Sequence, residues 1–280
     1  MQSDLPIGAA RPGFLSRRLA DVDVGGLALK LLRIGLFYLA LLGLWQLVIE
    51  LHIWKPYLVP APKDVWESFR FYVDNGLLWR AIKASMQHLV VGYVLSIFVG
   101  MAIGMFCGAN KYADETIGSL VLGLQSMPSI AWVPLGLVWF GFGAQAVVFV
   151  VFLGSFSAIA ISARSAIMSI PPLYRRAAFT MGANQFQRIR YMLLPAMVPG
   201  MAQGLKLGWS FAWRSAMAAE LINAGQISLG GLLETGRGVN DMSLVVMVMF
   251  VIIAIGVAVD RIFFARIEGW VQDRWGLSNT

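Results

Sequence analysis

The clearest pattern along the chain is a series of apolar runs long enough to cross a lipid bilayer. No Asp, Glu, Lys or Arg occurs between Thr116 and Ala163. A transmembrane helix needs about 20 predominantly apolar residues, so this run predicts two crossings joined by a tight turn, which we place at residues 141–143. The pattern predicts six crossings in total, at residues 31–51, 88–108, 117–140, 146–170, 196–221 and 243–264.

Composition supports an all-α integral membrane protein. Hydrophobic residues make up 58% of the chain and charged residues 13%, whereas soluble domains carry about 25% charged residues. We therefore expect a transmembrane domain at residues 31–265, preceded by a flexible cytoplasmic tail at 1–30 and followed by a cytoplasmic tail at 266–280. The first apolar run is too long for a signal peptide and is expected to be a retained anchor.

The distribution of basic residues predicts the orientation of the chain. Lys and Arg favour the cytoplasmic side of a membrane, and placing both termini inside puts most of the basic residues of this chain there. The net charge of +7 is therefore attributed to orientation and to anionic lipid headgroups, and no nucleic-acid partner is predicted. The chain is therefore expected to be a multi-pass membrane protein with both termini in the cytoplasm.

The first external loop is predicted to hold a short surface helix. After Pro62, the apolar residues Val65, Phe69 and Tyr72 recur at helical spacing. The dipeptide that follows at 75–76, Asn-Gly, is expected to end this helix.

The charged loop between the fourth and fifth crossings, residues 171–195, is the segment that points most strongly to a partner protein. Pro171 and Pro172 end the fourth crossing and suit the first turn of a new helix, which we expect to end at Gly182. A second helix at 183–193 is predicted to lead to Pro195 and the next crossing. An ordinary basic loop is the alternative interpretation.

The first helix of this loop has the side chains of a docking element. Ala177 and Ala178 permit close approach of another backbone, while Phe179 and Met181 are able to fill an apolar socket. The arginines would remain at the rim of that contact.

The loop resembles the EAA motif of ABC-importer permeases, in which an acidic residue, two alanines and a glycine precede isoleucine, any residue, leucine and proline. The residues in register here are Ala177, Ala178, Gly182, Leu194 and Pro195. Two positions depart from the motif, because Arg176 replaces the usual glutamate and Met192 the usual isoleucine. The first departure removes any salt bridge that the glutamate would make.

Three further segments resemble permeases of the nitrate/sulfonate/taurine importer group. They are LVPAP from Leu58, MPSIAWVPLGLVWFG from Met127 and AAELI from Ala218. The resemblance implies a type I importer fold, a second permease copy, two ABC ATPase subunits on the cytoplasmic loops and a periplasmic or lipid-anchored solute-binding protein. It also implies a small anion such as a sulfonate, taurine, nitrate or bicarbonate as the solute.

The resemblance also assigns the contact with the ATPase. The residues it implies are Arg176, Ala177, Ala178, Phe179, Gly182, Leu194 and Pro195. The chain has no GxxxxGK[ST] phosphate loop, so ATP and Mg²⁺ are expected on the ATPase partner and no cofactor on this chain.

A polar stripe in the fifth crossing is a candidate for the translocation pathway. Gln203, Lys206, Ser210 and Arg214 share one helical face, and cations within an apolar segment usually face a cavity, an interface or a partner charge. The alternative is that both cations reach the headgroups or pair with Glu220.

The third crossing supplies two further pathway candidates, Gln125 and Ser129, beside the helix-breaking residues Pro128 and Pro134. Either a water-lined cavity or a packing kink would explain these prolines. In the last external loop, Glu234 and Arg237 are candidates for touching the binding protein.

Signals for enzyme chemistry are weak. The chain has two histidines, His52 and His88, and one cysteine, Cys107, with no cluster of metal-ligand residues. We therefore predict no catalytic or metal site. The alternatives to an importer permease are a stand-alone ion-coupled transporter, for which only Glu220 resembles a relay group, and a membrane scaffold or receptor.

Overall fold

The computed structural model describes residues 24–55, 58–223 and 225–276, which form helices and short connections with no strand among them. The chain separates into two units at Pro62 and Lys63. The helices are α2 (Val24–Glu50), α3 (Pro62–Asp74), α4 (Leu77–Ala109), α5 (Lys111–Ala113), η1 (Asp114–Gly118), α6 (Ser119–Ser126), η2 (Ser129–Trp132), α7 (Val133–Phe140), α8 (Ala144–Met168), α9 (Pro172–Thr180), α10 (Gln185–Arg188), η3 (Ile189–Leu193), α11 (Leu194–Ile222), α12 (Leu229–Gly238), α13 (Met242–Val259), η4 (Asp260–Phe264) and α14 (Ala265–Trp275).

The first unit contains α2, the first predicted crossing. This helix begins at Val24, so residues 24–30 belong to it and not to the predicted tail at 1–30. Residues 1–23 lie outside the described part of the chain.

Within the described residues, four helices are long and apolar enough to cross a membrane, and a bent pair makes a fifth. The four are Leu32–Glu50, Leu77–Ala109, Ala144–Met168 and Met242–Trp275. Helix α11 matches the sixth prediction in position, and its 29 residues would reach about 44 Å at 1.5 Å per residue. It is not among the apolar spans because small and polar residues interrupt it.

Two predicted boundaries need correction. Helix α4 begins at Leu77, not near His88, because Arg80 and Lys83 occupy exposed positions and do not interrupt it. At the other end of the chain, the predicted tail from residue 266 is helical up to Trp275. Helix α14 continues α13 through the π-helical turn η4 and buries Val271.

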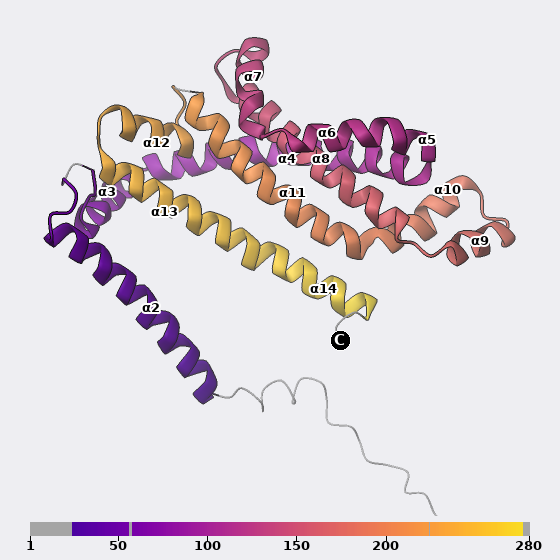
Figure 1. Cartoon of the computed structure of the whole chain (residues 1–280), viewed down its shortest axis with the longest axis horizontal. Coiled ribbons are helices and arrows are strands. Elements are labelled where there is room, and N and C mark those ends of the chain that lie inside the picture. Colours follow the sequence, from indigo (N-terminus) through magenta and orange to yellow (C-terminus); the bar gives the residue numbers. More distant parts are fainter. Residues whose placement is uncertain (1–23, 56–57, 224, 277–280) are drawn as a thin grey trace, which may run out of the picture. The chain divides into compact units, whose positions relative to one another are not determined.

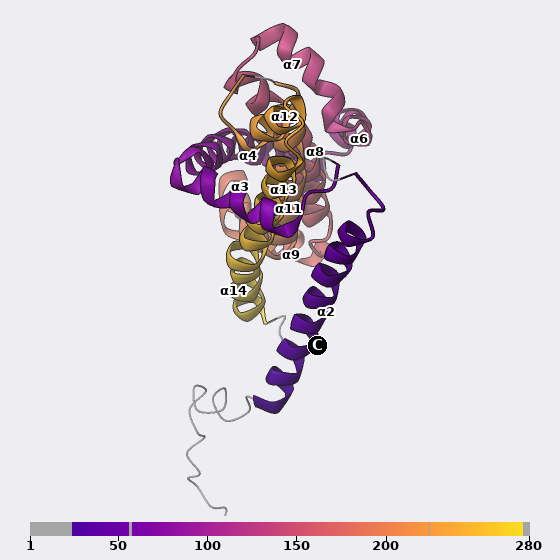
Figure 2. The ribbon, with the colours of Figure 1, turned by 90° about the vertical axis from the view of Figure 1, so that its left-hand side faces the viewer.

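The predicted third crossing is broken. Residues Lys111–Ser126 and Ser129–Phe140 meet at an angle of 98°, and Figure 2 shows α7 leaving the line of α6. The break falls at Pro128, which cannot donate the next helical hydrogen bond. The predicted tight turn follows α7, where Gly141 takes a φ of 70° before α8 begins.

The core of the second unit is the close contact between α4 and α8, which run along one another in Figure 1. A Cβ atom on Gly104 would lie 2.3 Å from the carbonyl oxygen of Ala160, and one on Gly100 would lie 2.7 Å from that of Phe156. The GxxxG pair of α4 therefore packs against a neighbour in the same chain. Such small-residue contacts let transmembrane helices approach closely.

Packing at Gly104 can be tested by substitution. Gly104→Ala should lower the free energy of unfolding by about 1–3 kcal/mol, because the added methyl group overpacks the helix contact. The measurement is thermal unfolding of the purified protein in detergent. Gly123→Ala is the matched control, since no atom lies within 4 Å of its Cβ position, and alanine there should stabilise α6 by about 0.5–1 kcal/mol. Equal behaviour of the two variants would contradict the proposed packing.

Candidate functional site

The loop between α8 and α11 is an ordered pair of short helices. Helix α9 begins with the predicted prolines, and Gly182 takes a φ of 72°, a conformation that glycine adopts without strain. There the Ala183 N–H donates to the Ala178 carbonyl at 3.1 Å. The Asn184 side chain then caps α10 through a reciprocal pair of hydrogen bonds with Gln187 at 2.8 and 2.9 Å.

This loop presents apolar side chains to its surroundings. Phe179 is 73% exposed and Met181 78% exposed, while Arg176 and Ala177 are also exposed. A hollow of about 530 Å³ lies beneath α9. It is lined by Ala109, Ile167, Arg176, Phe179, Thr180, Arg188, Met192 and Leu193.

Three predicted loop residues lie elsewhere than expected. Ala178 is only 7% exposed, so it packs inside the chain and does not itself offer a contact surface. Leu194 and Pro195 belong to α11. The predicted second loop helix does not end before Pro195, because α10, η3 and α11 follow one another without a break. Proline is tolerated at this position, the first turn of α11.

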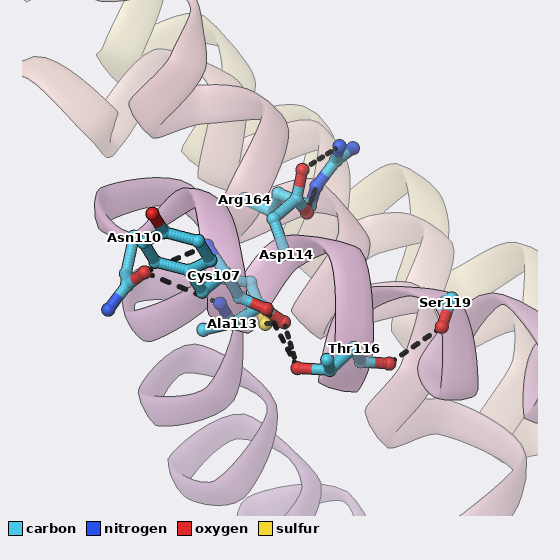
Figure 3. A network of polar contacts seen from close by, with 8 residues as sticks. Cys107, Asn110, Ala113, Asp114, Thr116, Ser119 and Arg164 are labelled. Carbon is cyan, nitrogen blue, oxygen red and sulfur yellow. Dashed lines mark hydrogen bonds and ion pairs between the residues drawn. The ribbon is translucent and has the colours of Figure 1, made fainter.

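An ion pair near this end of the second unit joins the broken crossing to α8. The Arg164 guanidinium binds both carboxylate oxygens of Asp114, and its Nη2 lies 2.6 Å from Oδ2 (Figure 3). Asp114 begins the π-helical turn η1, whose preceding helix is capped by Asn110. Paired hydrogen bonds of this kind fix orientation as well as distance.

The structure divides the predicted polar stripe of α11 into two environments. The Lys206 ammonium lies 3.2 Å from Asp260 Oδ1 and 3.4 Å from Glu268 Oε2, so it pairs with η4 and α14. Gln203 lies in a separate hollow beside Glu268. The predicted alternative of a Lys206 or Arg214 pair with Glu220 is wrong. Lys206 pairs with two other acids, and Arg214 lines a pocket that does not include Glu220.

Arg214 meets the two pathway candidates of the broken crossing. Gln125, Ser129 and Arg214 line one pocket of about 350 Å³ between α6, η2, α8 and α11. The Arg214 Nε donates to the Ser210 carbonyl at 3.1 Å, and its guanidinium lies 5.1 Å from the centre of the Phe211 ring. Three of the six predicted pathway residues are therefore brought together here.

Glu220 is buried, at 1% exposure, and connects three helices. Its Oε2 accepts hydrogen bonds from the Ser85 hydroxyl at 2.7 Å and from the Gly230 N–H at 3.1 Å. Its Oε1 lies 3.1 Å from His88 Nδ1, and the Ser85 hydroxyl accepts from the Leu229 N–H at 2.9 Å. The carboxylate thereby ties α12 to α4 and α11.

The two predicted binding-protein contacts lie on α12. The Arg237 Nη2 is 2.8 Å from Glu234 Oε1, and this hydrogen bond raises the pKa of the Arg237 guanidinium above its ordinary value. Arg237 is exposed, so it offers a fixed positive charge at this surface.

Sequence reasoning missed the partners of Glu220 and Asp114. The sequence predicts Glu220 only as a relay-like acid or as a partner of Lys206 or Arg214, but its partners Ser85 and His88 are more than 130 positions away. No local spacing reports such a contact. A buried acid within a membrane helix is, however, a general signal that a partner exists.

The fold defines an all-helical membrane protein with four or five apolar spans among the described residues, and comparison with known proteins identifies its family. The chain belongs to the family described as the binding-protein-dependent transport system inner membrane component, whose model matches residues 100–269. It is therefore the permease component of a binding-protein-dependent ABC importer, with the type I importer permease fold.

Individual relatives agree with this assignment, and a solved structure shares the fold. The riboflavin transport system permease protein of Chloroflexus aurantiacus is 28% identical, over 88% of this chain and 88% of the relative. The bicarbonate transport system permease protein of Synechococcus elongatus is 27% identical over 71% of each chain. An inward-facing chain of the MetNI methionine ABC transporter has a TM-score of 0.56 at 21% identity, over 68% of this chain and 96% of its own.

Removing the Glu220 carboxylate should destabilise the protein. Glu220→Ala leaves the Ser85 hydroxyl and the Gly230 N–H without their acceptor, and each buried unsatisfied group costs about 1–3 kcal/mol. Thermal unfolding in detergent measures the loss. The control is Glu115→Ala, which removes an exposed pair with Lys111 and should cost about 0.5 kcal/mol or less. A Glu220→Ala variant as stable as this control would show that the network contributes nothing.

Proposed function

We propose that this permease moves a small anionic solute inward by alternating access, driven by ATPase subunits that dock on residues 171–195. In this proposal ATP and Mg²⁺ bind to the partner, and no cofactor binds to this chain. The observation that carries the proposal is the exposure of Phe179 and Met181 on a capped loop with fixed geometry. Solvent-exposed apolar groups on such an element favour a protein partner.

An external source of energy fits the requirements of the transport cycle. Shifting a two-state gate from 1:99 to 99:1 needs about 5.5 kcal/mol of differential binding. An ATPase that changes shape with nucleotide would supply this energy through α9. The hollow beneath α9 would receive side chains of the partner, with Arg176 and Arg188 at its edge.

The opposite end of the second unit is suited to the solute-binding protein. Figure 1 shows α12 at the end of the bundle remote from α9 and α10. With the loop in the cytoplasm, Glu234 and Arg237 would face the periplasm and meet that protein. The predicted cytoplasmic termini, a second permease copy and contact with lipid complete this proposed arrangement in the inner membrane.

Two observations support an anion as the solute. The Arg214 guanidinium lines a pocket together with Gln125 and Ser129, and one relative is named for bicarbonate. The relative named for riboflavin indicates that family membership alone does not select the solute. The family assignment replaces the alternatives of a stand-alone ion-coupled transporter and of a scaffold.

The proposed orientation can be measured by cysteine labelling. Met181→Cys should react with a membrane-impermeant maleimide in inverted vesicles and not in intact spheroplasts. Val239→Cys should show the reverse pattern, since Val239 is also exposed and follows α12. The native Cys107 is buried and provides the unlabelled background. Labelling of Met181→Cys from outside would overturn the docking proposal.

Docking itself can be tested on the purified complex. The tagged permease should co-purify with an ABC ATPase, and Phe179→Asp should remove most of that subunit by placing a charge in an apolar contact. Phe98→Ala is the matched control, because Phe98 is equally exposed but lies on α4. Its complex should retain the ATPase. Absence of an ATPase from the unmodified complex, or full retention by Phe179→Asp, would contradict the proposal.

A further inference from the structure

The loop at residues 171–195 carries charge of one sign only. Its charged residues are Arg175, Arg176, Arg188 and Arg190, and it contains no Asp, Glu or Lys. Arg176 stands where the EAA motif has glutamate, so the charge at this position is reversed in this chain. A partner that docks on this loop therefore has to accommodate concentrated positive charge.

The hollow beneath α9 brings two of these arginines to one place. Arg176 of α9 and Arg188, the last residue of α10, both line this space of about 530 Å³. Phe179 and Met192 contribute apolar lining to the same hollow. Arg176 is exposed and Arg188 is partly buried. Two guanidinium groups from separate helices thus share a concave surface with apolar side chains.

The chain does not neutralise these two charges itself. Among the described residues no carboxylate lies within ion-pair distance of Arg176 or Arg188. Asp114 and Glu115, the acids of η1, already pair with other basic residues of this chain. Covering an unpaired guanidinium with another protein is costly unless that protein supplies the opposite charge. A docked partner therefore needs acidic groups at this hollow.

The composition of the surrounding surface favours a protein over a lipid headgroup as the source of those acids. Leu173, Tyr174, Phe186 and Tyr191 are between 61% and 73% exposed around the hollow's two helices. Aromatic residues and Arg are enriched in protein interfaces, whereas Lys, Asp and Glu are depleted there. Anionic lipids attract Lys and Arg alike and would give no reason for a loop without Lys. Arg, unlike Lys, binds a carboxylate through paired hydrogen bonds.

We propose that the ATPase surface that receives α9 is acidic and supplies carboxylates to Arg176 and Arg188. Phe179 makes the apolar contact beside these pairs, and the paired hydrogen bonds fix the orientation of the docked subunit. This inference rests on the proposed function, because it names the chemistry of the partner surface at the same docking loop. It also gives the contact specificity, since an ATPase with basic residues at this surface would be rejected by like charge.

Charge reversal tests the acidic surface on the complex purified through the tagged permease. Arg176→Glu combined with Arg188→Glu should lower the ratio of ATPase to permease at least about tenfold, because like charges would then meet in the contact. Washing the unmodified complex at about 0.5 M instead of about 0.1 M NaCl should release more ATPase, since salt screens exposed ion pairs. Arg266→Glu is the matched control, because Arg266 is also exposed but lies on α14. Full retention of the ATPase by the double variant would overturn the proposal.

Crosslinking identifies the acids directly and carries the test if charge reversal prevents assembly. Arg176→Lys and Arg188→Lys keep the positive charge and place a reactive amine in the hollow. A carbodiimide joins an amine to a carboxylate that it contacts, so peptide mass spectrometry should find each substituted position linked to an Asp or Glu of the ATPase. Arg266→Lys should give no such link. Absence of links from both loop positions in a complex that holds its ATPase would overturn the proposal.

The docking proposal and this inference fail in different ways. If ATPase retention requires Phe179 but survives the Arg176→Glu and Arg188→Glu changes, docking stands and the acidic surface is wrong. If the double variant keeps its ATPase but loses bound phosphatidylglycerol, the arginines serve lipid and the inference is overturned. If no ATPase accompanies the unmodified permease, both are wrong.

Discussion

The close approach of α4 to α8 is the contact on which the second unit depends. In lipid, apolar side chains gain little by leaving one hydrocarbon environment for another, so helix association relies on packing and on interhelical hydrogen bonds. Gly92, Gly100 and Gly104 each bring the two helices too close for any Cβ atom. The Ser155 hydroxyl adds a hydrogen bond to Ser96 across the same contact at 2.7 Å. Small residues thus perform the role that large apolar residues perform in a soluble core.

The same helix pair connects the two ends of the bundle. At one end, Glu220 ties α12 to α4 through Ser85. At the other, Arg164 of α8 holds Asp114 of η1, and Arg164 is close in sequence to the start of the loop at residues 171–195. Packed helices with such contacts have a few discrete arrangements and resist continuous deformation. A force applied at α9 is therefore expected to move α8 and its attachments together.

The sequence predicted the helices better than their contacts. Proline and glycine positions correctly indicated α9, the turn at Gly141 and the interruption at Pro128, because these residues constrain the backbone locally. Pro134, the other predicted helix breaker of this crossing, instead lies in the first turn of α7. The predicted start of α4 was wrong because the charged residues Arg80 and Lys83, which follow Leu77, lie on the exposed face of one continuous helix. Helical periodicity placed Lys206 and Arg214 on one face, but it gave no information on their partners. The partners of Lys206 come from η4 and α14, and the pocket neighbours of Arg214 come from the broken crossing, so only tertiary structure brings them near.

The different surroundings of Lys206 and Arg214 divide one face of α11 into a part that pairs with acids and a part that lines a pocket. Lys206 pairs with Asp260 and Glu268, so its charge links α11 to η4 and to the C-terminal helix α14. Arg214 faces the pocket at the break before Ser129, where a bent crossing leaves room that a straight helix would fill. A cation in an apolar segment is costly unless it meets an opposite charge or water. Among the described residues no carboxylate lies within ion-pair distance of Arg214, and this residue is exposed, so under the proposed function the anionic solute itself would supply the opposite charge.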